Sequence, residues 1–128
     1  MATWDDVRRF ALALPETSEG THFGGTAWRV KDKMFVFERP LRRADLAALG
    51  AAAPTGPILG ARVDHEGIKH ALIGQNPDVY FTIPHFDGYP AILVRLERIS
   101  LEELAELVED AWLAQAPKRL SKAYLDAR

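Results

Sequence analysis

Apolar residues recur at spacings of three and four near both ends of the chain, which is the period of an amphipathic helix. Near the start this pattern predicts a helix over residues 4–14, with an apolar face made of Trp4, Val7, Phe10, Ala11 and Leu14. Thr3 is placed to cap this helix, and Pro15 ends it.

The second helical pattern begins after Ser100, and Glu103 stands three residues later as in a capping box. Its apolar stripe consists of Leu101, Leu104, Val108, Ala111 and Trp112. Pro117 ends this helix and begins a basic tail that runs to Leu125. In that tail Leu120, Tyr124 and Leu125 are expected to dock on the body of the protein.

Between these helices the pattern changes to short apolar runs, rich in β-branched and aromatic residues, that are typical of strands. The predicted strands span residues 27–30, 34–37, 58–63, 79–83 and 91–96. Residues 31–33 are polar and predict a tight hairpin turn between the first two strands. The segment Pro84–Pro90 forms the tip between the last two strands.

Two stretches carry no strand pattern. Residues 16–25 are rich in glycine and predict a loop. Residues 39–56 are punctuated by proline and glycine, and they predict a long, flexible insertion in which residues 44–53 form about two turns of helix.

Residues 65–73 predict a short helix, capped by Asp64 and ended at Gly74. The order is therefore helix, strands, short helix, two strands and long helix, joined by hairpin-length connections. That order favours one α+β domain over residues 1–128, an antiparallel sheet with the N- and C-terminal helices packed on one face as a two-layer sandwich.

Composition narrows the functional classes. The chain has 128 residues, of which 48% are hydrophobic, and 16 Lys and Arg against 18 Asp and Glu give a formal charge of -2. A global positive field is therefore absent, and any basic site must be local. Cysteine is absent, which excludes disulfides and thiolate chemistry. No basic leader and no apolar run of roughly 18 residues is present, so we expect a cytoplasmic protein that does not enter membranes.

The tip Pro84–Pro90 holds the densest candidate chemistry, because His85, Asp87 and Tyr89 stand between two prolines. A carboxylate that orients an imidazole can support proton transfer. Equally, Asp87 can bond nearby backbone amides as an Asx turn while Gly88 supplies a positive φ. His22 is a candidate neighbour of His85 in space. Both interpretations stay open at the level of sequence.

Basic residues cluster in two places, the first hairpin and the C-terminal tail. They are Arg29, Lys31, Lys33, Lys118, Arg119 and Lys122. A hairpin beside a basic helix can contact a phosphate backbone, although simple solvation explains surface Lys and Arg equally well. We expect no metal and no cofactor, because the histidines lack metal-ligand spacing and residues 20–25 match no phosphate-binding loop.

Several motifs together resemble the MmcQ/YjbR family. They are residues 3–7, residues 28–35, the signature from Tyr80 to Pro90, residues 93–96, and the ending from Ala111 to Leu120. The resemblance covers nearly the whole chain outside residues 39–56. It implies a YjbR-like domain with a CyaY-like fold in a small bacterial protein, and members of the family are often labelled DNA-binding.

The sequence therefore leads to ranked hypotheses. The first is a non-enzymatic module that contacts DNA through a local basic face, as a monomer or weak dimer. The second is a protein-interaction or small-ligand module that uses the Pro84–Pro90 loop. The third is an enzyme in which His85 acts as acid or base and Asp87 orients it.

Overall fold

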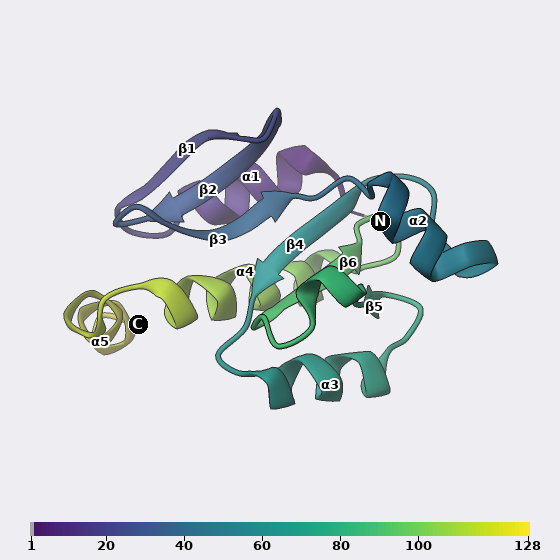
Figure 1. The fold of residues 1–128 in the computed structure, drawn as a ribbon. Helices are drawn as coiled ribbons and strands as arrows, with labels where there is room; N and C mark the ends of the chain where they lie inside the picture. The colour runs from purple at the N-terminus through teal and green to yellow at the C-terminus, as the bar shows by residue number, and fades with distance from the viewer. Residues whose placement is uncertain (1) are drawn as a thin grey trace.

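The computed structural model describes residues 2–128 as a six-stranded antiparallel sheet with helices on both sides (Figure 1). The strands follow the order β1-β2-β3-β4-β6-β5 across the sheet. In chain order the elements are α1 (Trp4–Leu12), β1 (Thr17–His22), β2 (Gly25–Val30), β3 (Lys33–Glu38), α2 (Arg43–Leu49), the 3-10 turn η1 (Gly50–Ala52), β4 (Ile58–Arg62), α3 (Glu66–Gln75), β5 (Tyr80–Phe81), the 3-10 turn η2 (Pro84–Phe86), β6 (Ala91–Arg95), α4 (Leu101–Gln115) and α5 (Lys118–Asp126).

The larger core lies between the sheet and the helices α1 and α4, as the α+β prediction requires. Trp112 of α4 is fully buried there, together with Val7 of α1 and Phe35 of β3. The stripe predicted for α4 is confirmed except for Leu101, which is exposed. Leu120 and Tyr124 of α5 pack against this core as predicted, whereas Leu125 is exposed and does not dock.

A smaller core covers the second face of the sheet over β3, β4 and β6. Phe37, Leu93 and Phe86 of η2 are buried in it, and Leu49 of α2 packs on its edge. Within residues 2–128, the part of the second face beside this cluster has no helix over β1 and β2 (Figure 1). The fold therefore leaves part of one sheet face open next to the loop that follows β5.

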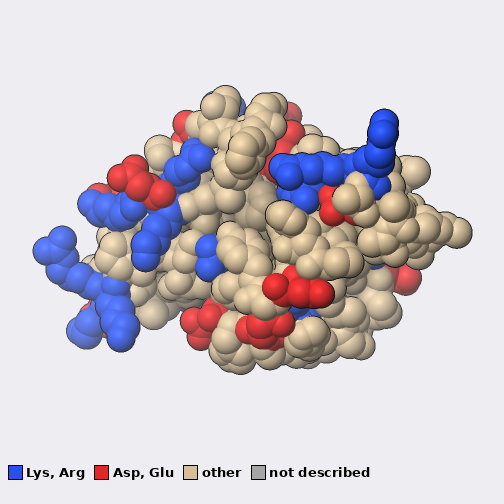
Figure 2. Space-filling view, in the orientation of Figure 1, with Lys and Arg blue, Asp and Glu red and all other residues tan. Residues whose placement is uncertain are grey.

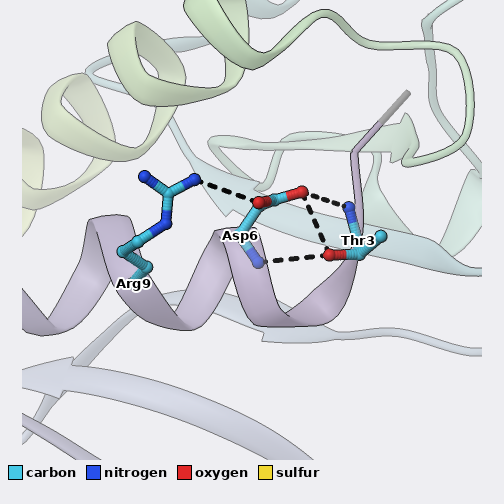
Figure 3. A network of polar contacts seen from close by, with 3 residues as sticks. All are labelled: Thr3, Asp6 and Arg9. Atoms are coloured by element: carbon cyan, nitrogen blue, oxygen red, sulfur yellow. Dashed lines mark hydrogen bonds and ion pairs between the residues drawn. The ribbon is translucent and has the colours of Figure 1, made fainter.

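The N-terminal cap is confirmed in detail. The Asp6 amide donates to Thr3 Oγ1 at 3.3 Å, and the Thr3 amide donates to the Asp6 carboxylate at 2.9 Å (Figure 3). Arg9 then pairs with the same carboxylate at 3.0 Å. These contacts satisfy amides of the first turn that have no partner within the helix, so α1 begins at Trp4.

One predicted feature near the start of the chain is wrong. Residues 16–25 are not a loop, because Thr17–His22 forms β1 and pairs with β2 along its whole length. This edge strand lacks apolar residues, so it gave no hydrophobic signal. Glu19 takes the place of an apolar contact, since its carboxylate accepts from Trp28 Nε1 at 3.0 Å and from Arg8 Nε at 2.8 Å.

The predicted cap of α3 is also wrong. His65, and not Asp64, is the cap residue, and its Nδ1 accepts from the Gly67 amide at 3.1 Å. The helix also continues through Gly74 to Gln75. At α4 the Glu103 amide bonds to Ser100 Oγ at 3.1 Å, but the Glu103 carboxylate accepts from the Tyr80 hydroxyl, so only one half of the capping box forms.

The predicted helix within residues 39–56 is confirmed as α2, followed by η1. A buried ion pair anchors this segment, because Arg39 lies 3.1 Å from the Asp45 carboxylate and both side chains are at least nine-tenths buried. Asp45 also accepts from the Arg42 amide at 2.9 Å. The flexibility predicted for this segment stays a prediction.

Candidate functional site

A pocket of about 330 Å³ lies on the second face of the sheet, where the β1–β2 turn, the end of β3 and the η2 loop converge. We call it the histidine pocket. Its lining residues are His22, Phe23, Met34, Phe37, Glu38, Arg39, Pro40, Arg42, His85, Phe86 and Tyr89. The two histidines that the sequence placed 63 positions apart thus line one cavity.

Phe23 forms the outer wall of this pocket. It occupies the two-residue turn between β1 and β2 with Gly24, and its side chain is 84% exposed. Its φ is +48°, a left-handed conformation that non-glycine residues adopt at a cost. The His22 ring lies 4.6 Å from the Phe23 ring, edge to face. The turn therefore holds an aromatic ring out in solvent.

The η2 loop forms the opposite wall and is held from behind by a buried lysine. Lys69 of α3 is 1% exposed, and its Nζ donates to the Phe86 carbonyl at 2.7 Å. Glu66 lies 2.8 Å from the same Nζ and balances its charge. Gly88 has a φ of +77°, as predicted for the turn. The loop thus has a fixed backbone under its exposed side chains.

Three arginines contact the aromatic rings around the pocket. Arg62 lies 4.7 Å from the Tyr89 ring centre and donates to the Tyr89 hydroxyl at 3.2 Å. Arg39 lies 5.6 Å from the Phe86 ring, and Arg42 lies 5.7 Å from the Phe23 ring. Cation–π contact of this kind stabilises the rings in place and puts positive charge beside them.

The structure separates the residues of the predicted motif loop. His85 and Tyr89 line the histidine pocket, whereas Asp87 does not. Across residues 2–128 no hydrogen bond joins Asp87 to His85, so the acid–orienter pair considered from sequence is not assembled. The predicted Asx turn is also missing from the side-chain hydrogen bonds of this stretch, where the Asp87 amide instead donates to the Pro84 carbonyl at 3.0 Å.

The two predicted basic clusters lie at one end of the molecule. Figure 1 places the β2–β3 turn and α5 at the same end, and Figure 2 shows Lys and Arg gathered there. Gln115, at the end of α4, joins the two regions by donating to the Met34 carbonyl at 3.0 Å. We call Lys31, Lys33, Lys118, Arg119 and Lys122 the basic end.

Carboxylates neutralise part of the basic end. Lys31 lies 2.5 Å from the Glu16 carboxylate, and Lys122 lies 3.2 Å from that of Asp126. Lys33, Lys118 and Arg119 form no ion pair within residues 2–128. Arg29, the sixth predicted residue, is turned toward β1, where it donates to the Thr21 carbonyl at 3.1 Å.

A second and larger cleft, of about 900 Å³, lies between α3 and α4. Its rim is acidic, with Glu102, Glu103, Glu106 and Asp110 along α4. Partial burial, together with the Glu109 and Glu106 carboxylates, raises the pKa of Asp110. Within residues 2–128 no group of three His or carboxylate side chains is arranged to hold a metal ion.

Sequence reasoning missed two prominent residues of the histidine pocket, Phe23 and Arg42. The signal for Phe23 was the Phe23-Gly24 step between a polar run, residues 17–22, and the predicted strand at residues 27–30, which is compatible with a two-residue hairpin turn. Nothing in the residues around Arg42 indicated a place in the pocket, because Arg42 reaches the pocket only through the course of the chain between β3 and α2.

None of the helices in the described part of the chain is long and apolar enough to cross a membrane.

An antiparallel sheet with α1 and α4 on one face and a loop-built pocket on the other defines a class of small α+β proteins. The chain belongs to the YjbR family, whose model matches residues 12–114. This finding confirms the resemblance drawn from the Tyr80–Pro90 signature and the motifs around it.

Uncharacterized proteins of Mycobacterium bovis and Mycobacterium tuberculosis are 53% identical to this chain over 128 residues, covering 98% of this chain and 97% of theirs. The crystal structure of the Deinococcus radiodurans protein DR2400, which carries the domain DUF419, is similar with a TM-score of 0.69. That match covers 99% of this chain and 88% of the other at 22% identity, so it shows the shared fold.

Proposed function

We propose that this protein is a non-catalytic module that binds DNA through the basic end. The observation that carries the proposal is the convergence of two basic clusters, far apart in the sequence, at one end of a chain with a net charge of -2. A local positive surface on an otherwise acidic protein favours one orientation toward a polyanion.

The geometry of α5 supports this proposal. Lys118 and Arg119 occupy its first turn, which contains no acidic residue, and the cap residue Pro117 provides no side-chain hydrogen bond. The positive end of the helix dipole therefore adds to two side-chain charges at the same place. Phosphate groups are the ligands that such a helix start favours.

The relatives fit this proposal only in part. Their descriptions assign no role. The case for DNA binding therefore depends on charge and geometry. Since the contacts are with phosphates, we expect little sequence preference.

The test is the salt dependence of binding to a labelled DNA duplex of mixed sequence, measured by fluorescence anisotropy. With three unpaired cations at the basic end, the slope of log K against log salt concentration should be roughly -3. A flat salt dependence, or no binding at low salt, would rule the proposal out.

The variant Lys118→Gln with Arg119→Gln removes two charges from the basic end and should weaken binding and lower the slope by about two. The matched control is Arg43→Gln with Arg98→Gln, which removes the same charge from α2 and from the loop before α4. These positions lie away from α5 (Figure 1). Equal weakening by both variants would show that net charge, and not this surface, drives binding.

A further inference from the structure

We propose that the histidine pocket binds a small aromatic anion, a planar ring that carries N–H donors and an acidic group. The pocket lies by the β1–β2 turn, at the opposite end of β2 from the turn that contributes to the basic end. The proposal is therefore independent of DNA binding.

Phe23 has an unfavourable backbone conformation for a residue with a large side chain. Hairpin turns of two residues favour Asn-Gly, because the first position needs a positive φ. This chain places phenylalanine there, at a φ of +48° and with 84% of the side chain exposed. Backbone strain and an exposed ring thus coincide at one residue, on the rim of a cavity. Strained residues concentrate at functional sites, and a ring in this position offers a flat surface for stacking.

Two arginines, Arg39 and Arg42, also line the pocket. Arg39 is buried and neutralised by Asp45. Arg42 is exposed, lies 5.7 Å from the Phe23 ring and pairs with no carboxylate within residues 2–128. A guanidinium beside a stacking surface favours a ligand that joins a ring to a carboxylate or a phosphate.

The other polar groups that line the pocket include Glu38, His22 and His85. Glu38 is the one carboxylate among the lining residues, and it forms no ion pair in the described part of the chain. A carboxylate accepts hydrogen bonds only, so it selects a ring with N–H donors. His22 and His85 supply further N–H groups or acceptors around the same space.

The size of the cavity fits this ligand class. A volume of about 330 Å³ lies at the lower end of the range of roughly 300–1,000 Å³ for small-molecule sites. Phe37 and Phe86, both buried, give the pocket an apolar floor. Ring stacking on Phe23, an acidic group at Arg42 and N–H donors toward Glu38 together describe one compact ligand.

The test is a titration followed by amide and imidazole shifts in two-dimensional NMR spectra of the full chain. Guanosine monophosphate and 2-aminobenzoate carry all three features, with a phosphate and a carboxylate respectively. Guanosine lacks the anion, inorganic phosphate lacks the ring, and benzoate lacks the N–H donor. We expect saturable shifts at Phe23, His22 and His85 with at least one complete probe, and affinity about tenfold lower for each probe that lacks one feature.

Two variants sharpen the test. Phe23→Leu keeps an apolar side chain but removes the stacking ring, and Arg42→Gln removes the charge; each should weaken binding of the complete probe by about tenfold. Arg43→Gln is the matched control, because Arg43 is an exposed neighbour on α2 that does not line the pocket.

The proposal is overturned if neither complete probe gives a saturable shift at millimolar concentration. It is equally overturned if inorganic phosphate binds as tightly as guanosine monophosphate, or if Arg43→Gln weakens binding as much as Arg42→Gln. DNA binding at the basic end is measured in a separate experiment. The failure of one proposal can therefore be told apart from the failure of the other.

Discussion

Asp6 shows how one side chain can organise the start of a helix. Its carboxylate accepts from the Thr3 amide, the Thr3 hydroxyl and Arg9, and all three contacts lie within the first turns of α1 (Figure 3). The bond from the Thr3 backbone is the largest cause of a lowered Asp6 pKa, and Arg9 adds to it. The ionised carboxylate is therefore the form that the folded protein favours.

This shift gives a prediction for stability against pH. Because the pKa of Asp6 is lower in the folded protein than its ordinary value of 3.8, the stabilisation is complete above that pH and is lost as the pH falls through the folded pKa. Asp6→Asn should lower the melting temperature at pH 7 and have little effect in strong acid. Thermal unfolding followed by circular dichroism at both pH values checks this.

Thr3→Ala is the companion variant. It removes the hydroxyl cap without changing charge and should cost about 1 kcal/mol at pH 7. A loss of stability for Asp6→Asn that is the same at pH 7 and in strong acid would contradict the assignment of its effect to the carboxylate charge.

At the scale of elements, the apolar pattern was a good guide wherever an element has a buried face. The spacing of Leu104, Val108 and Trp112 predicted α4 within one residue at its start, and the runs around Phe35 and Leu93 predicted β3 and β6. The edge strand β1 was missed because its contact with α1 is made by Glu19 and not by an apolar side chain.

The candidate site was harder to predict for a different reason. His22 and His85 were each singled out, but their shared pocket depends on the strand order, which brings β1 and the η2 loop to one face of the sheet. Sequence spacing carries no information about that order. Arg42 and Phe23 were missed because their positions follow from the path of α2 and the shape of one turn.

The register of β3 and β4 leads to an element-scale prediction. Gly60 pairs with Phe37, and a Cβ added to Gly60 would lie 2.3 Å from the Phe37 ring. Gly60→Ala must therefore push this ring, which lines the histidine pocket. We expect a loss of roughly 1–3 kcal/mol in the free energy of unfolding, measured by urea denaturation.

Gly74→Ala is the control for that measurement. Gly74 lies inside α3 with no heavy atom within 4 Å of an added Cβ. Alanine there should stabilise the protein by up to about 1 kcal/mol, because it is the better helix former. Equal and small effects of the two substitutions would show that the β3–β4 packing tolerates a shift of Phe37.

At the scale of the whole molecule, an N-terminal and a C-terminal segment of the chain both contact Trp112. The Trp112 Nε1 donates to the Pro15 carbonyl at 3.1 Å, and the centre of the Tyr124 ring of α5 lies 4.9 Å from that of the Trp112 ring. The Tyr124 hydroxyl donates to Glu109 at 2.5 Å. The helix that carries the basic side chains thus also packs against the main core.

Removal of residues 117–128 should therefore destabilise the fold and not only remove charge. Loss of the Leu120 and Tyr124 contacts is expected to cost roughly 2–4 kcal/mol, from about 1.5–3 kcal/mol for each fully buried side chain reduced for partial exposure. Urea denaturation, followed by the fluorescence of the three tryptophans, measures this loss. Unchanged stability would mean that α5 is an appendage, and the truncated chain, which lacks Lys118, Arg119 and Lys122, would then serve as a negative control in the DNA test.

The bond from Lys69 to the Phe86 carbonyl bears on how well the η2 loop tolerates substitution. A backbone oxygen holds the η2 loop in place, so the anchor does not depend on which side chains the loop displays. The exposed His85 can then be exchanged with little effect on the path of the η2 loop. A loop held through its backbone tolerates a new side chain at its surface without a change in its course.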